Sequence, residues 1–101
     1  KGIMVNQNES CFYENDAKAM QRAYKRINST FEICRVYSAH IPTYPSGYWL
    51  FGFASKRLDP INDFDEESWL SLNMITRYYN PELHRAAFAL PTYVKELLED
   101  A

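Results

Sequence analysis

The sequence has few of the residues from which several common kinds of site are built. Only three glycines are present, Gly2, Gly47 and Gly52, and they form no glycine-rich loop of the kind that cradles a nucleotide phosphate. The two cysteines, Cys11 and Cys34, are too few for a disulfide scaffold and lack the spacing of zinc ligands. This cysteine usage favours a reduced, soluble compartment, which we take to be the cytoplasm.

Positive charge and long apolar runs are also scarce. Lys and Arg number 11 against 13 Asp and Glu, a net charge of −2, so there is no cationic excess to neutralise the phosphates of a nucleic acid. The longest uninterrupted apolar run, Tyr48 to Ala54, contains a glycine and is far too short to span a bilayer. We therefore expect no nucleic-acid partner and no membrane partner.

The residues that are abundant indicate a folded domain. Hydrophobic residues make up 47% of the 101 positions, a share that excludes wholesale disorder. Aromatic residues reach 16%, with eight tyrosines, which is a heavy load for so short a chain. The length fits a single domain with a small core.

The order of apolar and turn-forming residues predicts an α/β fold. Residues Ile3 to Val5 are typical of a short buried strand of a parallel sheet. Because natural chains seldom begin next to such a strand, we expect the sequence to be a piece of a longer chain. Two further strands, Phe31–Ile41 and Tyr48–Ser55, are joined by a short turn and are expected to pair as an antiparallel hairpin.

Four helices are expected from the spacing of apolar residues. Asp65 or Ser68 is expected to cap the second of them, and Asn80, followed by a proline, the third. In the last helix we expect four apolar residues to face inward: Tyr93, Val94, Leu97 and Leu98. The expected helices are Ser10–Asn28, a short helix through Trp69, Leu72 and Ile75, Glu82–Phe88, and Thr92–Glu99.

Polar side chains follow the first expected strand. Gln7, Asn8 and Glu9 come directly after it, and open α/β sheets bind ligands beyond the carboxyl ends of their strands. One carboxylate and two amides at this position could bind a cation or an amine. The alternative is that Asn8 and Glu9 simply begin the next helix.

The turn of the hairpin is the most unusual local sequence. Pro42 and Pro45 stiffen it, so that Tyr44 between them is held in one direction. A phenol offers a donor, an acceptor and a π face to a cation. The alternative is a hairpin loop whose tyrosine covers the edge of the core.

The histidines and the acidic segment give no sign of catalysis or metal binding. His40 and His84 have neither zinc-ligand spacing nor a Ser-His-Asp arrangement, so we expect a packing role for His40 and a structural hydrogen bond for His84. Residues Leu58 to Glu67 are rich in Asp, Asn and Pro but lack EF-hand spacing. We interpret them as an exposed acidic loop with a solvated face.

Four short strings identify a family when taken together. They are GIMVNQ at 2–7, IPTYPSG at 41–47, RYYNP at 77–81 and HRAAFALP at 84–91. In this order they resemble the C-terminal part of the spermidine synthase family, the polyamine aminopropyltransferases, over essentially the whole sequence. The resemblance implies that residues 1–101 are the C-terminal segment of a methyltransferase-like Rossmann domain, without the N-terminal β-domain and the donor-binding half.

The family resemblance also implies a reaction. These enzymes transfer an aminopropyl group from decarboxylated S-adenosylmethionine, a co-substrate, to putrescine, giving spermidine and methylthioadenosine without a cofactor. They are usually homo-oligomers. The proton-accepting Asp and the acidic donor-binding residues lie upstream in the family, so the resemblance implies an enzyme by parentage and no activity for these residues alone. Two alternatives remain open: a different amine acceptor, or a stand-alone binding module.

Four residues match substrate-binding positions of the family. Gln7 and Glu9 would face the distal amine, directly or through water, and Tyr44 would contact the amine near the reaction centre. Trp49 falls where the family has an apolar residue that lines the methylene chain of the diamine. The resemblance implies neither a metal ligand nor a catalytic residue among the 101 positions.

Overall fold

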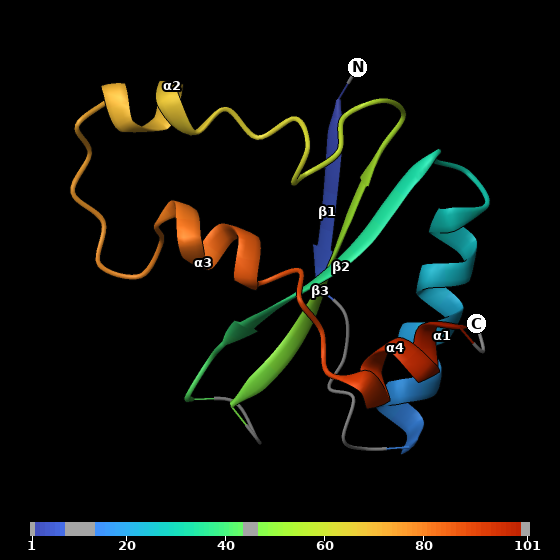
Figure 1. The fold of residues 1–101 in the computed structure, drawn as a ribbon. Helices are drawn as coiled ribbons and strands as arrows, with labels where there is room; N and C mark the ends of the chain where they lie inside the picture. The colour runs from blue at the N-terminus through green and yellow to red at the C-terminus, as the bar shows by residue number, and fades with distance from the viewer. Residues whose placement is uncertain (1, 8–13, 44–46, 100–101) are drawn as a thin grey trace.

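A computed structural model describes residues 2–7, 14–43 and 47–99, with the side chains of residues 14–16 left out of the description (Figure 1). No helix in these ranges is both long and apolar enough to cross a membrane. The described residues form seven elements: β1 (Ile3–Gln7), α1 (Glu14–Asn28), β2 (Ile33–His40), β3 (Tyr48–Ser55), α2 (Glu66–Ser71), α3 (Pro81–Ala86) and α4 (Thr92–Glu99).

The three strands form one sheet in the order β1-β3-β2. β3 lies in the middle and is antiparallel to both neighbours, so β1 and β2 run in the same direction. The hairpin prediction is confirmed, with β2 pairing to β3 from Ile33 opposite Ser55 up to His40 opposite Tyr48. The predicted α/β class is likewise confirmed.

The prediction that β1 is a buried, parallel-type strand is wrong for the described residues. Its only neighbour among them is the antiparallel β3, and Ile3 and Val5 are 53% and 60% exposed. A short apolar run indicates a strand but does not show what covers its faces. Within the part of the chain that the structure describes, β1 is therefore an edge strand with an exposed apolar face.

The core lies on one face of the sheet, under α1 and α4. Met20, Val36, Leu50 and Val94 are buried together, and Figure 1 shows α1 and α4 on one side of the sheet with α2 and α3 on the other. In α4 the expectation holds for Val94, Leu97 and Leu98, which pack in or against this core, but not for Tyr93, which is exposed. Position 93 lies at the margin of this helix face, next to 97 but about 100° around the helix axis from 94.

The ends of the two middle helices follow their capping residues. The carboxylate of Asp65 accepts from the backbone N–H of Ser68 at 3.0 Å, and the side-chain oxygen of Asn80 accepts from that of Leu83 at 2.7 Å, which confirms both predicted caps. α2 nevertheless ends before Ile75, which is 96% exposed. Asn73, at a φ of 52°, has a left-handed conformation that α-helices do not continue through.

Gly52 is required by the side chain of its cross-strand partner, Asn6. A Cβ at position 52 would lie 2.1 Å from Asn6 Oδ1 and 3.2 Å from Asn6 Cγ. We expect Gly52→Ala to lower the free energy of unfolding by about 1–3 kcal/mol, the usual cost of overpacking. Urea unfolding of Gly52→Ala, Asn6→Ala and the double variant measures this, and we expect the double variant to be more stable than the two losses predict by addition. Strict additivity would contradict the steric explanation.

Candidate functional site

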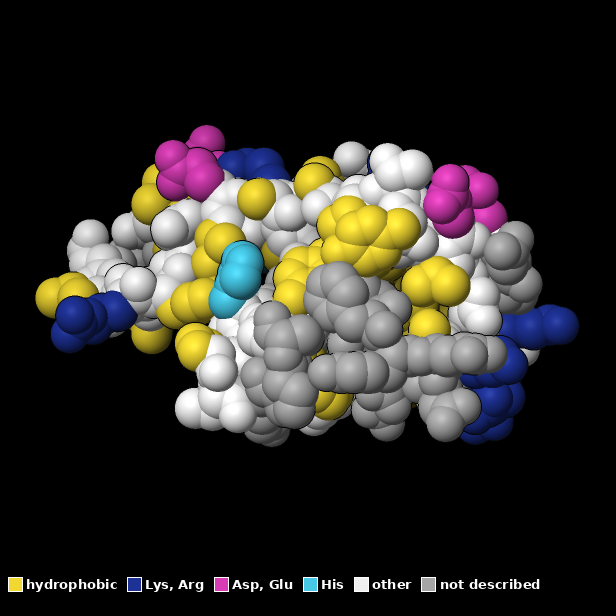
Figure 2. Space-filling model, turned by 90° about the horizontal axis from the view of Figure 1, so that it is seen from below, with side chains coloured by type: hydrophobic (Ala, Val, Ile, Leu, Met, Phe, Trp, Pro, Cys, Tyr) yellow, Lys and Arg dark blue, Asp and Glu magenta, His cyan; other side chains and the backbone are white. Residues whose placement is uncertain are grey.

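The C-terminal ends of β1 and β2 lie at one end of the sheet. β1 ends at Gln7 and β2 at His40, and because both strands run antiparallel to β3, the loop at 41–47 leaves from this same end. Open α/β sheets place their ligand crevice there. Figure 2 views the molecule from below: the described side chains in the middle of the view are largely hydrophobic, and Lys, Arg, Asp and Glu lie toward its outline.

Two of the four predicted site residues can be placed by the register. Gln7 pairs with Phe51, and Trp49 lies two residues further along β3. Side chains two apart on a strand leave the same face, so Gln7 and Trp49 are diagonal neighbours, roughly 7–8 Å apart. Gln7 is exposed and Trp49 half-buried. Glu9 and Tyr44 lie outside the described residues, so their roles stay predictions.

A cavity of about 510 Å³ opens on this face of the sheet, opposite the α1 and α4 side. The sheet contributes Ile3, Val5, Tyr37 and Phe53 to its wall, and residues from 58–65 and 78–88 complete it. Its lining is mostly apolar and aromatic. The side chains of Gln7 and Trp49 leave the same face, nearer the end of the sheet where β1 and β2 finish.

The cavity corrects the interpretation of 58–67 as an exposed acidic loop. Pro60 is buried, and Leu58, Ile61 and Phe64 are half-buried. The apolar residues alternate with acidic ones, so the composition concealed them. The available signal was the presence of four apolar residues within positions 58–64, which is more than a fully solvated segment needs.

His84 ties the segment 58–65 to α3. Its Nε2 lies 2.7 Å from the backbone oxygen of Pro60, and its Nδ1 lies 2.8 Å from the hydroxyl of Tyr79. A carbonyl only accepts, so Nε2 carries a proton and donates to it; in the tautomer protonated at Nε2 alone, Nδ1 accepts from the Tyr79 hydroxyl. Burial raises the pKa of Tyr79, which keeps this donor protonated.

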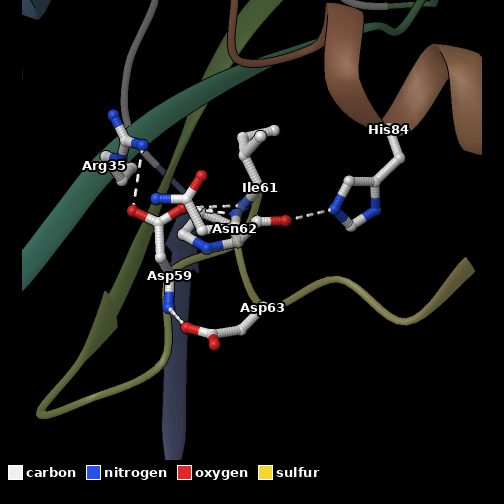
Figure 3. Close-up of polar contacts among 7 residues, drawn as sticks. Arg35, Asp59, Ile61, Asn62, Asp63 and His84 are labelled. Atoms are coloured by element: carbon white, nitrogen blue, oxygen red, sulfur yellow. Dashed lines mark hydrogen bonds and ion pairs between the residues drawn. The ribbon is translucent and has the colours of Figure 1, made fainter.

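The ring of His84 also stacks on Phe64, with centroids 4.0 Å apart and planes 7° apart. Figure 3 shows the imidazole reaching the turn that begins at Asp59. Both ring nitrogens thus make hydrogen bonds within the fold. The prediction of a structural hydrogen bond for His84 is therefore confirmed.

Asp59 organises the turn that His84 contacts. One carboxylate oxygen accepts from the backbone N–H groups of Ile61 (2.8 Å) and Asn62 (2.9 Å), and the other pairs with Arg35 Nη2 at 3.0 Å (Figure 3). The N–H of Asp59 in turn donates to Asp63 at 2.7 Å. These carboxylates serve the turn, and no group of three or more potential metal ligands occurs among the described residues.

Asp59 makes the stability of the fold depend on pH. The backbone N–H of Asn62 in the first place, then that of Ile61 and the Arg35 guanidinium, lower the pKa of Asp59 below its ordinary 3.8. A pKa lowered by folding stabilises the fold above the unfolded-state pKa, and this contribution is lost as the pH falls through the folded-state pKa.

We therefore expect Asp59→Asn to cost up to about 1 kcal/mol above about pH 5, because the exposed Arg35 side chain leaves the ion pair open to screening by solvent. The difference from the unsubstituted chain should shrink as the pH falls below 4. Urea unfolding at a series of pH values measures it. A difference that does not change with pH would contradict this role of the charge.

Comparison with known proteins assigns the family. The model of the spermine/spermidine synthase domain matches residues 1–66, two thirds of the chain. The chain belongs to this family. The sequence resemblance is thus confirmed.

Members of the spermine/spermidine synthase family match nearly the whole chain. The polyamine aminopropyltransferase of Alkaliphilus oremlandii is 63% identical over 98 residues, 97% of this chain and 34% of its own length. That of Clostridium perfringens is 63% identical over 99 residues, 98% of this chain and 35% of its own length. The crystal structure of spermidine synthase from Thermotoga maritima is 44% identical, covers 99% of this chain at a TM-score of 0.89, and is itself covered over 35%.

A second solved structure, a spermidine synthase in complex with the transition state analogue AdoDATO, gives the same TM-score of 0.89 at 44% identity, covering 99% of this chain and 34% of that one. The chain therefore has the fold of the corresponding part of spermidine synthase. It spans about a third of the length of the curated relatives that it matches.

Proposed function

We propose that this chain is the C-terminal third of a spermidine synthase and forms the C-terminal segment of its Rossmann-like catalytic domain. The full-length enzyme would transfer an aminopropyl group from decarboxylated S-adenosylmethionine to putrescine, giving spermidine and methylthioadenosine. The observation that carries the proposal is 63% identity to polyamine aminopropyltransferases over nearly the whole chain. We extend the proposal to a cytoplasmic homo-oligomer that needs no cofactor.

In this reaction the amine nitrogen attacks the carbon next to the sulfonium. A C–N bond forms, the C–S bond breaks with its electron pair going to sulfur, and a proton leaves the nitrogen for a base. This chain would supply the amine end of the site. The Gln7 amide oxygen suits a distal ammonium, and the half-buried Trp49 indole suits the methylene chain. Glu9 and Tyr44 join them on the family resemblance, and the base and donor site lie elsewhere in the parent.

An activity assay on the full-length enzyme tests the proposal. Putrescine, cadaverine and spermidine compete as acceptors, with methylthioadenosine as the measured product. We expect turnover with a preference for putrescine, and none from residues 1–101 alone. A preference for spermidine would move the assignment to another aminopropyltransferase, and no methylthioadenosine with any acceptor would favour a binding module.

Glu9→Gln tests the amine end of the site. Loss of one charged hydrogen bond is worth about 1.5–3 kcal/mol, so we expect roughly a 10- to 100-fold loss in kcat/KM for putrescine. The KM of the nucleoside donor should stay within about twofold. Glu67→Gln, on the exposed face of α2, is the matched control and should change neither. Equal losses for both substrates would remove Glu9 from the amine site.

A further inference from the structure

The outer edge of β2 is held by the C-terminal segment. Among the described strands, β2 has only β3 as a neighbour, so alternate backbone N–H groups point outward. The N–H of Ser38 donates to the carbonyl of Ala87 at 2.9 Å. Two residues later, the N–H of His40 donates to the hydroxyl of Tyr78 at 3.1 Å. Both bonds bridge stretches of the chain that lie far apart in sequence.

Tyr78 is placed unusually for a large aromatic residue. It is 53% exposed and lies between α2 and α3, outside any helix or strand. The hydroxyl of the neighbouring Tyr79 does not bond to β2 but forms a hydrogen bond with His84. The hydroxyl of Tyr78 is thus the one that reaches the end of β2.

The bond from His40 falls where the hairpin meets the candidate site. His40 is the last residue of β2, and the adjacent Ala39 is the cross-strand partner of Trp49. On the inner side, the N–H of Ile41 donates to the carbonyl of Gly47 at 2.9 Å and closes the hairpin. Tyr78 therefore bonds to the outer side of the C-terminal end of β2, while Trp49 lies on β3, along the inner side of the same strand end.

We propose that Tyr78 is a positioning residue for the amine substrate: its hydroxyl holds the end of β2, and through it Trp49, in the orientation that binds the methylene chain. The inference rests on the proposed aminopropyl transfer. Tyr78 acts through the backbone of His40 and does not touch the reacting atoms. Removing the hydroxyl alone should therefore weaken amine binding while the donor site is unaffected.

The test compares Tyr78→Phe with Tyr79→Phe in the full-length enzyme. One lost hydrogen bond corresponds to roughly a two- to tenfold change, so we expect Tyr78→Phe to raise the KM for putrescine by that factor, with the donor KM and the Tm unchanged. Tyr79→Phe loses its bond to His84 and should lower the Tm with an unchanged KM for putrescine. Hydrogen exchange of the peptide 38–43 should become faster in Tyr78→Phe only.

The possible outcomes distinguish the positioning role of Tyr78 from the proposed aminopropyl transfer. If the unsubstituted enzyme forms no methylthioadenosine, the proposed function fails and the positioning role with it. If the enzyme is active and Tyr78→Phe keeps the wild-type KM for putrescine, the positioning role alone is overturned, whatever the exchange rate of 38–43. A rise in the donor KM equal to that for putrescine would also overturn it.

Discussion

Replacing Leu50 by alanine is expected to lower the free energy of unfolding by about 2–5 kcal/mol, the range found for truncated buried leucines. Leu50 is fully buried in the central strand and belongs to the cluster that joins the sheet to α1 and α4. Truncation removes its contacts with Met20, Val36 and Val94 and leaves a cavity among them. Urea unfolding followed by near-UV circular dichroism measures the loss.

The size of the effect follows from the small core. Domains are stable by only about 5–15 kcal/mol, so Leu50→Ala removes a large share of the total. Leu70→Ala is the matched control, since this leucine on α2 is 56% exposed, and we expect a change within about 0.5 kcal/mol. Equal midpoints for Leu50→Ala and the unsubstituted chain would show that the core lies elsewhere.

His84→Ala is expected to cost about 2–4 kcal/mol, because it leaves a buried carbonyl acceptor unpaired and opens a gap beside an aromatic ring. The carbonyl is that of Pro60, which accepts from His84 Nε2, and the ring is that of Phe64. The hydroxyl of Tyr79 loses its acceptor at the same time. Thermal unfolding measures the loss, together with faster proteolysis within 58–65.

Two further variants separate the contributions of His84. His84→Gln keeps an N–H donor for Pro60 but loses the stacked ring, so its loss should lie between zero and that of His84→Ala. His40→Ala removes the other histidine, whose side chain is exposed, and should change the stability by no more than about 0.5 kcal/mol. A His40→Ala variant as unstable as His84→Ala would contradict the special role of His84.

Much of the fold could be predicted from local sequence. The hairpin strands follow from β-forming residues on either side of a proline-rich turn, and both were placed to within two residues. The caps Asp65 and Asn80 could be predicted because a short polar side chain satisfies helix N–H groups wherever a helix begins. These features depend on neighbours within a few positions.

Features that depend on distant neighbours could not be predicted. Whether Ile3 and Val5 are covered depends on what packs against the sheet, and the pattern of β1 contains no such information. The burial of Pro60 depends on α3 and His84, which lie more than 20 positions away. For the site, the sequence indicated Gln7 and Trp49 as separate residues, and only the register made them neighbours.

The hydrogen bonds from β2 to Tyr78 and Ala87 affect which edge of the sheet can accept a further strand. An edge strand with unsatisfied N–H groups is a template for further strands, and at Ser38 and His40 that template is occupied. At these two positions an additional strand cannot pair with β2, whereas among the described residues the outer edge of β1 has no neighbouring strand. Intermolecular pairing should therefore be favoured at the outer edge of β1, beside the exposed side chains of Ile3 and Val5, so concentrated samples of residues 1–101 should associate through the first strand more readily than through the hairpin.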